Sequence, residues 1–251
     1  MARILTEETS LARKRDALMH ETDVLSRLLR YEWIGAGALL LAGAILWWVR
    51  DSAAIFGLGV AGLIFAVAHT FRIRENRGEE QSVRAGLRGE ADVTRALSQT
   101  LDNTHYIFND LLIRNGRTSA QIDHLVVGPR GLFLVETKNW RGHIEGGAGD
   151  EQWTQTRAPG VPPIRLHNPI IQARRQANFL RESLRRAGVR SPEIHPLVVF
   201  RSPRTTFRIS DADLPLLRPD EAARHIRDFT ATEPCDEAQV DAVVQHLMRI
   251  A

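Results

Sequence analysis

The spacing of apolar and polar positions divides the chain into helical and extended stretches. Apolar residues that recur every three or four positions predict amphipathic helices. The clearest helix begins after Asn168, a typical N-cap residue, and has Pro169 in its first turn. The expected helices cover Thr6–Arg30, Glu90–Leu101, Asn168–Ala187, Pro219–Phe229 and Asp236–Ile250.

Between the helices, short apolar runs bounded by turn residues predict β-strands. Asn115-Gly116 is one turn signal, and Gly128-Pro129-Arg130-Gly131 is another. The expected strands cover Tyr106–Ile113, Ile122–Val127, Leu132–Glu136 and Ile194–Phe200, with a short additional strand at Trp153–Thr156. The order helix, three strands, helix, strand predicts an α/β fold in which a mixed sheet is flanked by helices.

Two stretches without charged residues, Trp33–Val49 and Ala53–Ala68, precede this region. As helices with their flanks they would each cover roughly 25–30 Å, which is enough to cross the hydrocarbon core of a bilayer. They predict a two-helix transmembrane hairpin over 31–71; the alternative is a buried helical hairpin of a soluble protein. Because Arg50 is the one basic residue of the connecting turn, both termini are expected in the cytoplasm of a multi-pass protein of the bacterial inner membrane.

Composition adds two constraints. The net charge of +3 is too small to indicate nucleic-acid binding by itself, although arginine clusters occur locally. Cys235 is the single cysteine, so an internal disulfide is excluded and a reducing compartment is indicated. Lys138 is one of only two lysines, although Lys and Arg together number 33. An ammonium is a compact point charge whose pKa responds to its surroundings, unlike a guanidinium. A lysine in a chain that otherwise uses arginine at nearly every basic position therefore indicates a chemical role.

A candidate site lies around the turn at Pro129-Arg130. If these two residues form the turn, Gly128 faces Gly131, and the same register places Asp123 opposite Glu136 and Gln121 opposite Lys138. The alternative is a type I turn with Gly131 as a bulge, which would shift the register by one residue.

Two carboxylates on opposed strand positions repel each other unless a cation lies between them. Asp123 and Glu136, with help from Glu90, are therefore candidate ligands of Mg²⁺ or Mn²⁺. Lys138 would position the attacking water or the scissile phosphate, and Gln172 would orient the nucleophile or contact phosphate. Zinc is not indicated, because no His and Cys residues have the spacing of zinc ligands.

Arginines of the Asn168–Ala187 helix are candidates for contacts with a nucleic-acid backbone. They are Arg174, Arg175 and Arg181, followed by Arg185 and Arg186. The alternative is a solvated helix face, because these arginines are scattered around the helix.

Several of these residues together resemble one known family, the nuclease-related domain NERD. The resemblance rests on Gly89-Glu90, Gln121-Ile122-Asp123-His124, Gly131, Glu136-Thr137-Lys138-Asn139-Trp140, Gly142, Trp153, Asn168-Pro169 and Gln172. It covers about Gly86–Phe200 and implies a PD-(D/E)XK nuclease fold with an αβββαβ core, divalent-metal chemistry and DNA as substrate. It also implies catalytic roles for Glu90, Asp123, Glu136 and Lys138, with Gln172 as an accessory residue. Ile122 stands where the superfamily name has Pro.

The expected organisation is an N-terminal cytoplasmic helix over 1–30, the transmembrane hairpin over 31–71, and a charged linker over 72–85. A nuclease-like domain over 86–205 and a helical extension over 206–251 follow. Together these features predict a membrane-anchored, metal-dependent nuclease that hydrolyses DNA at the cytoplasmic face. The alternative is a non-catalytic, nuclease-derived module that binds nucleic acid or a protein partner at the membrane.

Overall fold

The computed structural model describes residues 1–5 and 89–250, together with scattered positions between 16 and 71. The chain divides into two compact units. One contains Met1–Ser10 and Gly86–Ala251, and the other contains Leu11–Ala85. Most of the predicted N-terminal helix and the whole charged linker lie outside the described residues.

The larger unit is built on a six-stranded mixed sheet, whose strand order is β1-β2-β3-β4-β8-β10. Strands β2, β3 and β4 form an antiparallel meander, whereas β8 pairs with β4 in parallel. The strands are β1 (Arg3–Ile4), β2 (Tyr106–Asn115), β3 (Thr118–Gly128), β4 (Gly131–Lys138), β8 (Ile194–Phe200) and β10 (Leu216–Leu217). Buried residues run without interruption from His124 to the end of β3 and through β4 as far as Glu136, as expected where strands are covered on both faces.

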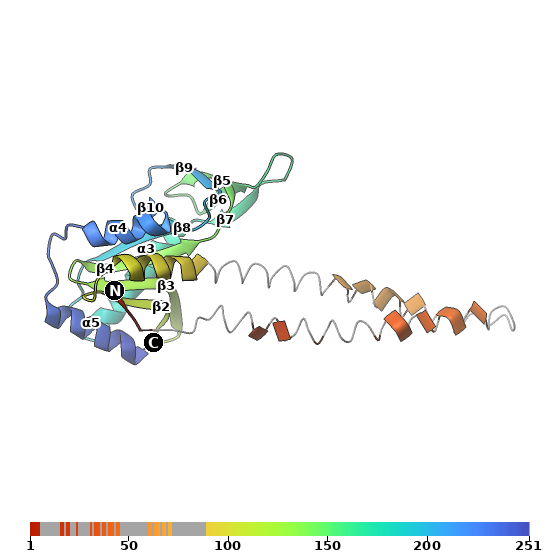
Figure 1. The fold of residues 1–251 in the computed structure, drawn as a ribbon, viewed down its shortest axis with the longest axis horizontal. Coiled ribbons are helices and arrows are strands. Elements are labelled where there is room, and N and C mark those ends of the chain that lie inside the picture. Colours follow the sequence, from red (N-terminus) through yellow and green to blue (C-terminus); the bar gives the residue numbers. More distant parts are fainter. Residues whose placement is uncertain are drawn as a thin grey trace. The chain divides into compact units, whose positions relative to one another are not determined.

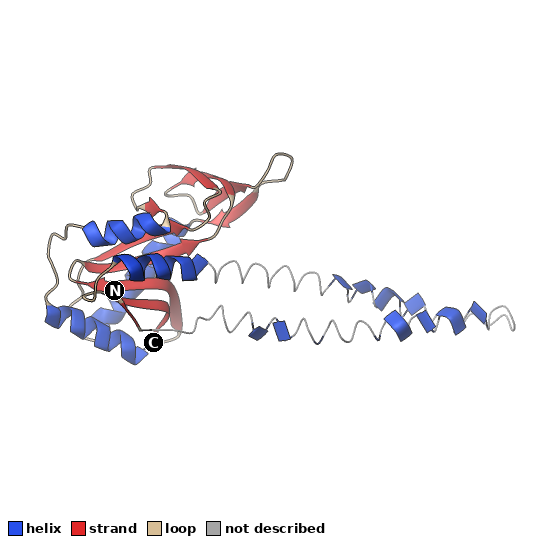
Figure 2. Cartoon of the chain, in the orientation of Figure 1, coloured by secondary structure: helices blue, strands red, loops and turns tan. Residues whose placement is uncertain are grey.

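Helices cover both faces of this sheet (Figures 1 and 2). On one face, helix α3 (Pro169–Arg186) and helix α5 (Glu237–Ile250) share a core with the sheet. On the other face, the helical residues 89–100 and helix α4 (Pro219–Asp228) form a second core. Each helix buries one apolar stripe, so the fold has three layers with the sheet in the middle.

A smaller four-stranded sheet lies beside the end of the main sheet (Figure 1). Its strand order is β7-β6-β5-β9, with β5 (Gly142–Gly147), β6 (Gln152–Thr156), β7 (Ile164–His167) and β9 (Thr205–Ser210). Its inner face is held by Trp153, which is fully buried and packs edge-on against Trp140. A Cβ at Gly146 would lie 2.3 Å from Trp153, so this contact requires glycine.

The predicted order of helix, three strands, helix and strand is confirmed, and so is the short strand at Trp153–Thr156. Both C-terminal helices are also present. The sequence pattern missed β1, β5, β7, β9 and β10. Strands β1 and β10 have two residues each and pair with distant segments, so they carry no periodicity of their own.

The predicted membrane hairpin is not supported. Of the helices in the described residues, none has both the length and the apolar character that crossing a membrane requires. A stretch without charged residues has the composition of a transmembrane segment. It does not follow that the stretch forms a continuous apolar helix of about 20 residues. The prediction of a multi-pass protein of the inner membrane is therefore corrected. Parts of the predicted hairpin, among them 46–59, lie outside the described residues.

Candidate active site

The hairpin of β3 and β4 sets the site, and its register is the one without a slip. Gly128 pairs with Gly131 and His124 with Val135, so the Pro129-Arg130 turn adds no bulge. Gly131 has a φ of 120°, which only glycine adopts without strain. Counted from the turn, the β3–β4 pairing ends with His124 and does not reach Asp123, the residue that precedes it in the sequence. Strand β4 continues to Lys138, paired with β8. Asp123 and Glu136 are the next residues in this register, and they are near enough for the Glu136 carboxylate to act on the pKa of Asp123.

The Asp123 carboxylate faces β4. Its Oδ2 accepts a hydrogen bond from the backbone N–H of Thr137 over 2.8 Å, which replaces the strand pairing that ends at His124. Burial raises the pKa of Asp123 well above its usual value, and the nearby Glu136 carboxylate raises it further. The Lys138 ammonium and the Thr137 hydrogen bond act in the opposite direction but do not cancel these effects.

Glu136 and Lys138 point to the same side of β4 and contact each other. Lys138 Nζ donates to Glu136 Oε1 over 2.5 Å and to Gln172 Oε1 over 3.0 Å. The Glu136 side chain is only 1% exposed, and that of Lys138 is 17% exposed. The other Glu136 oxygen, Oε2, accepts a hydrogen bond from Gln176 Nε2 over 2.8 Å. The ammonium is therefore held in place by a buried carboxylate and an amide.

Helix α3 supplies the two glutamines because its start is fixed. Asn168 Oδ1 caps the helix by accepting from the N–H of Ile170 over 2.9 Å. The Asn168 amide also donates to the carbonyls of Ala148 and Asp150, which join the helix to the β5–β6 loop. Gln172 and Gln176 are one helical turn apart, so both side chains reach the end of β4 that carries Glu136 and Lys138. Gln176 was missed from the sequence, although its spacing from Gln172 would have indicated it.

Glu90 lies near the start of the helix at 89–100 and belongs to the same electrostatic cluster. Burial raises its pKa from 4.5 to about 7, with further contributions from Asp110 and then Glu136. Gly89 precedes it and lies against Asn139, which follows Lys138. The helix start and the end of β4 are thus neighbours, although they are about fifty residues apart in the sequence.

Asp110 is a fourth carboxylate at the site, and sequence reasoning missed it. It lies on β2, between Asn109, which pairs with His124, and Leu111, which pairs with Ile122. Its position is therefore opposite Asp123. Its φ of 53° is unusual for a residue other than glycine, and such conformations cluster at functional sites. The Asp110 carboxylate accepts a hydrogen bond from the amide of Gln121, two residues before Asp123.

His124 follows Asp123 and lies in the core beside the site. It is fully buried, and burial lowers its pKa to about 3, so its ring is neutral. Its Nδ1 lies 2.8 Å from Asn109 Oδ1, which also accepts from the hydroxyl of Thr94 on the helix at 89–100. This chain of contacts fixes that helix against β2 and β3.

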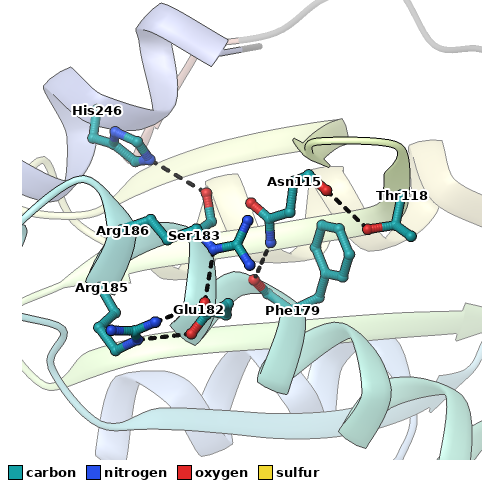
Figure 3. Close-up of polar contacts among 8 residues, drawn as sticks. All are labelled: Asn115, Thr118, Phe179, Glu182, Ser183, Arg185, Arg186 and His246. Atoms are coloured by element: carbon teal, nitrogen blue, oxygen red, sulfur yellow. Dashed lines mark hydrogen bonds and ion pairs between the residues drawn. The ribbon is translucent and has the colours of Figure 1, made fainter.

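Most of the arginines of α3 that were predicted to contact a nucleic-acid backbone have partners within the protein. Arg174 pairs with Asp213, and Arg181 donates to Asn178 over 2.6 Å. Figure 3 shows that Arg185 and Arg186 both bond to Glu182, at 2.8 and 2.7 Å. Arg175 is exposed. Four of the five arginines thus have a partner within the protein, and they do not form a shared basic track.

The donor set matches a hard divalent cation in charge. Asp123, Glu136 and Glu90 supply three carboxylates, and their mutual repulsion contributes to the raised pKa values of Asp123 and Glu90. An ion at this point would remove the repulsion, and oxygen ligands are those that Mg²⁺ accepts. Among the described residues, however, no three such side chains are close enough together to form a ready metal site.

Comparisons with known proteins agree with this geometry. Residues 85–201 match the family model described as nuclease-related domain, NERD, and this range includes all five predicted catalytic positions. A segment of 72 residues is 39% identical to an uncharacterized protein of Bacillus anthracis. That match covers 28% of this chain and 34%, or about one third, of the relative's length. No solved structure matches the chain. Residues 85–201 thus match the nuclease-related domain NERD, and this match is consistent with the PD-(D/E)XK nuclease superfamily.

Proposed function

We propose that this protein is a divalent-metal-dependent nuclease that hydrolyses phosphodiester bonds of DNA. The observation that carries the proposal is the charge arrangement at the end of β4. The carboxylates of Glu90, Asp123 and Glu136 act on one another electrostatically, Glu90 and Asp123 have raised pKa values, and the Lys138 ammonium bonds to Glu136. A cluster of this kind is destabilised without a cation and becomes favourable when one binds.

The residues would divide the chemistry as follows. Asp123, Glu136 and Glu90 would hold Mg²⁺ or Mn²⁺, which supplies an activated water and stabilises charge on the phosphoryl oxygens. Lys138 would bind a non-bridging oxygen of the scissile phosphate, where negative charge develops during the reaction. Gln172 is 3.0 Å from the Lys138 ammonium and keeps it aimed at that position.

A second candidate function is a nuclease-derived module that binds DNA without cutting it. The bonding of Glu136 favours this alternative, because Lys138 occupies one of its oxygens and Gln176 the other. Metal binding at Glu136 would have to use the remaining lone pairs of these oxygens, and the Lys138 ammonium at Oε1 would repel the cation. A domain in which this repulsion excludes the metal would retain the fold and lose the chemistry.

The test is a cleavage assay with the full chain, plasmid DNA and Mg²⁺ or Mn²⁺. We expect cleavage by the parent protein and a loss of about 100-fold or more for Asp123→Asn and for Lys138→Ala, since each removes a group that contacts the reacting centre. Glu182→Gln is the matched control, because it also removes a carboxylate, at a point on α3 that only contacts arginines. Equal cleavage by all four proteins would exclude the nuclease, and DNA binding without cleavage would favour the module.

A further inference from the structure

The smaller sheet has one face packed against the core and one face directed outward. Strand pairing places Arg165, Thr154, Glu145 and Arg208 side by side in one row across β7, β6, β5 and β9. The neighbouring row contains His143 and Thr206. We call the face formed by these six residues the outer face. The residues between them in sequence, such as Ile144 and Trp153, are buried on the opposite side.

The outer face carries unbalanced positive charge. Arg165 and Arg208 are exposed, and within the described part of the chain neither takes part in an ion pair. The same holds for Arg141 and Arg204, which precede β5 and β9. Glu145 is the carboxylate of these rows, and it already lies 3.2 Å from the His143 ring. These arginines differ in this respect from those of α3, most of which bond to carboxylates.

The small sheet is joined to the candidate active site through the segment that follows β4. Arg141 follows Lys138 by three residues, a distance of at most about 11 Å in an extended chain. The backbone N–H of Arg201 donates to the carbonyl of Lys138, and that of Gly142 donates to the carbonyl of Arg204. The Lys138 ammonium also lies 5.8 Å from the centre of the Trp140 ring, which packs against Trp153. The small sheet is therefore held at a fixed position relative to the site.

We propose that the outer face binds the sugar–phosphate backbone of the DNA whose scissile phosphate lies at Lys138. This inference rests on the proposed function, because it concerns the same substrate. Four strands at a spacing of about 4.8 Å make the face roughly 14 Å wide, and duplex DNA carries one charge per about 1.7 Å of its axis. The face thus covers several phosphates. Guanidinium and hydroxyl groups are the side chains that bind phosphate oxygens without reading sequence.

The test is binding of the full chain to a fluorescent DNA duplex of about 20 base pairs at several salt concentrations, with EDTA present so that cleavage cannot occur. The double variant Arg165→Gln/Arg208→Gln is compared with Arg185→Gln/Arg186→Gln. Both pairs are exposed, and both lower the net charge of +3 by two, to +1, so any difference reflects position and not total charge. A third variant, Thr154→Glu, places a negative charge in the central row of the outer face.

We expect the Arg165/Arg208 double variant to bind at least about tenfold more weakly, and the slope of log K against log salt to decrease by about two. The α3 double variant should stay within about twofold of the parent, and Thr154→Glu should weaken binding as the first variant does. Equal weakening by both double variants, or no weakening by the Arg165/Arg208 double variant and Thr154→Glu, would overturn the inference. Since binding is measured without metal, a parent protein that fails to cleave DNA would refute the proposed nuclease without deciding this result.

Discussion

The two ends of helix α3 use polar side chains in opposite ways. At its N-terminal end, uncharged amides face the site: the half-buried Gln172 contacts Lys138, and the buried Gln176 contacts Glu136. At its C-terminal end, charged side chains pair with each other at the surface, where Glu182 bonds to Arg185 and Arg186 (Figure 3). The same helix therefore carries a part of the site at one end and a solvated ion-pair cluster at the other.

This difference shows which polar contacts affect the site. A buried hydrogen bond is costly to remove because the remaining partner loses water and gains nothing in return. When an exposed ion pair is broken, both side chains regain contacts with water, so the free energy of the protein changes little. We therefore expect substitutions at the N-terminal end of α3 to have large effects and comparable substitutions at its C-terminal end to have small ones.

The largest expected effect follows from Gln176→Leu. Gln176 is 6% exposed and donates to Glu136 Oε2 and to the carbonyl of Gln121, both over 2.8 Å. Leucine has a similar volume but leaves the buried Glu136 oxygen without this donor. We expect the free energy of unfolding to fall by about 2–3 kcal/mol, measured by urea denaturation with EDTA present. Asn178→Leu, two residues further along the helix at an exposed position, should change it by less than about 0.5 kcal/mol.

The next effect concerns activity. Gln172→Ala removes the acceptor that lies 3.0 Å from the Lys138 ammonium, while Glu136 still holds that ammonium at 2.5 Å. We expect the cleavage rate to fall by about tenfold, which corresponds to roughly 1.4 kcal/mol, with little change in thermal stability. A decrease in stability as large as that of Gln176→Leu would show that Gln172 supports the fold and does not position Lys138.

A smaller effect, with a defined pH dependence, is expected for Glu90→Gln. The pKa of Glu90 is about 7 in the folded chain and 4.5 in the unfolded chain. Between these values the folded chain binds more protons, so the parent loses stability as the pH rises through this range. The variant lacks this titration. It should be more stable than the parent by about 1 kcal/mol near pH 8 in EDTA, and this advantage should disappear as the pH falls below the unfolded pKa.

Thermal melts of both proteins across the pH range provide the measurement for Glu90→Gln. A variant that is less stable than the parent at high pH would mean that Glu90 makes a favourable contact in the folded chain. Added Mg²⁺ should reverse the order, because the ion stabilises the parent, in which the carboxylate is present.

Much of the site followed from local sequence signals. The Gly128 to Gly131 turn determines which residues of β3 and β4 face each other, and the predicted register agrees with the observed one as far as His124 and Val135. The N-cap at Asn168 located α3 and with it Gln172. Strand alternation then placed Lys138 on the same side as Glu136. Each of these steps depends on residues that are close together in the sequence.

The features that were missed depend on distant contacts. Asp110 lies in the middle of an apolar strand, and its proximity to Glu90 exists only after the helix at 89–100 has packed on the sheet. The ion pair of Arg174 is made with Asp213, which is 39 residues away in the sequence. Strand β9 pairs in parallel with β5, more than sixty residues earlier, so no turn between them signals the second sheet. Periodicity cannot reveal any of these contacts.

The smallest expected effect tests the surface end of α3. The pKa of Glu182 is lowered to about 2, first by the hydrogen bond from Arg185 and then by that from Arg186. Its stabilising contribution is therefore present above the ordinary pKa of a glutamate and decreases as the pH falls towards 2. Because all three side chains are solvated, Glu182→Gln should shift the melting temperature by no more than about 1 °C at pH 7. A shift as large as that of Gln176→Leu would remove the distinction between the two ends of the helix, since a surface ion pair would then matter as much as a buried amide.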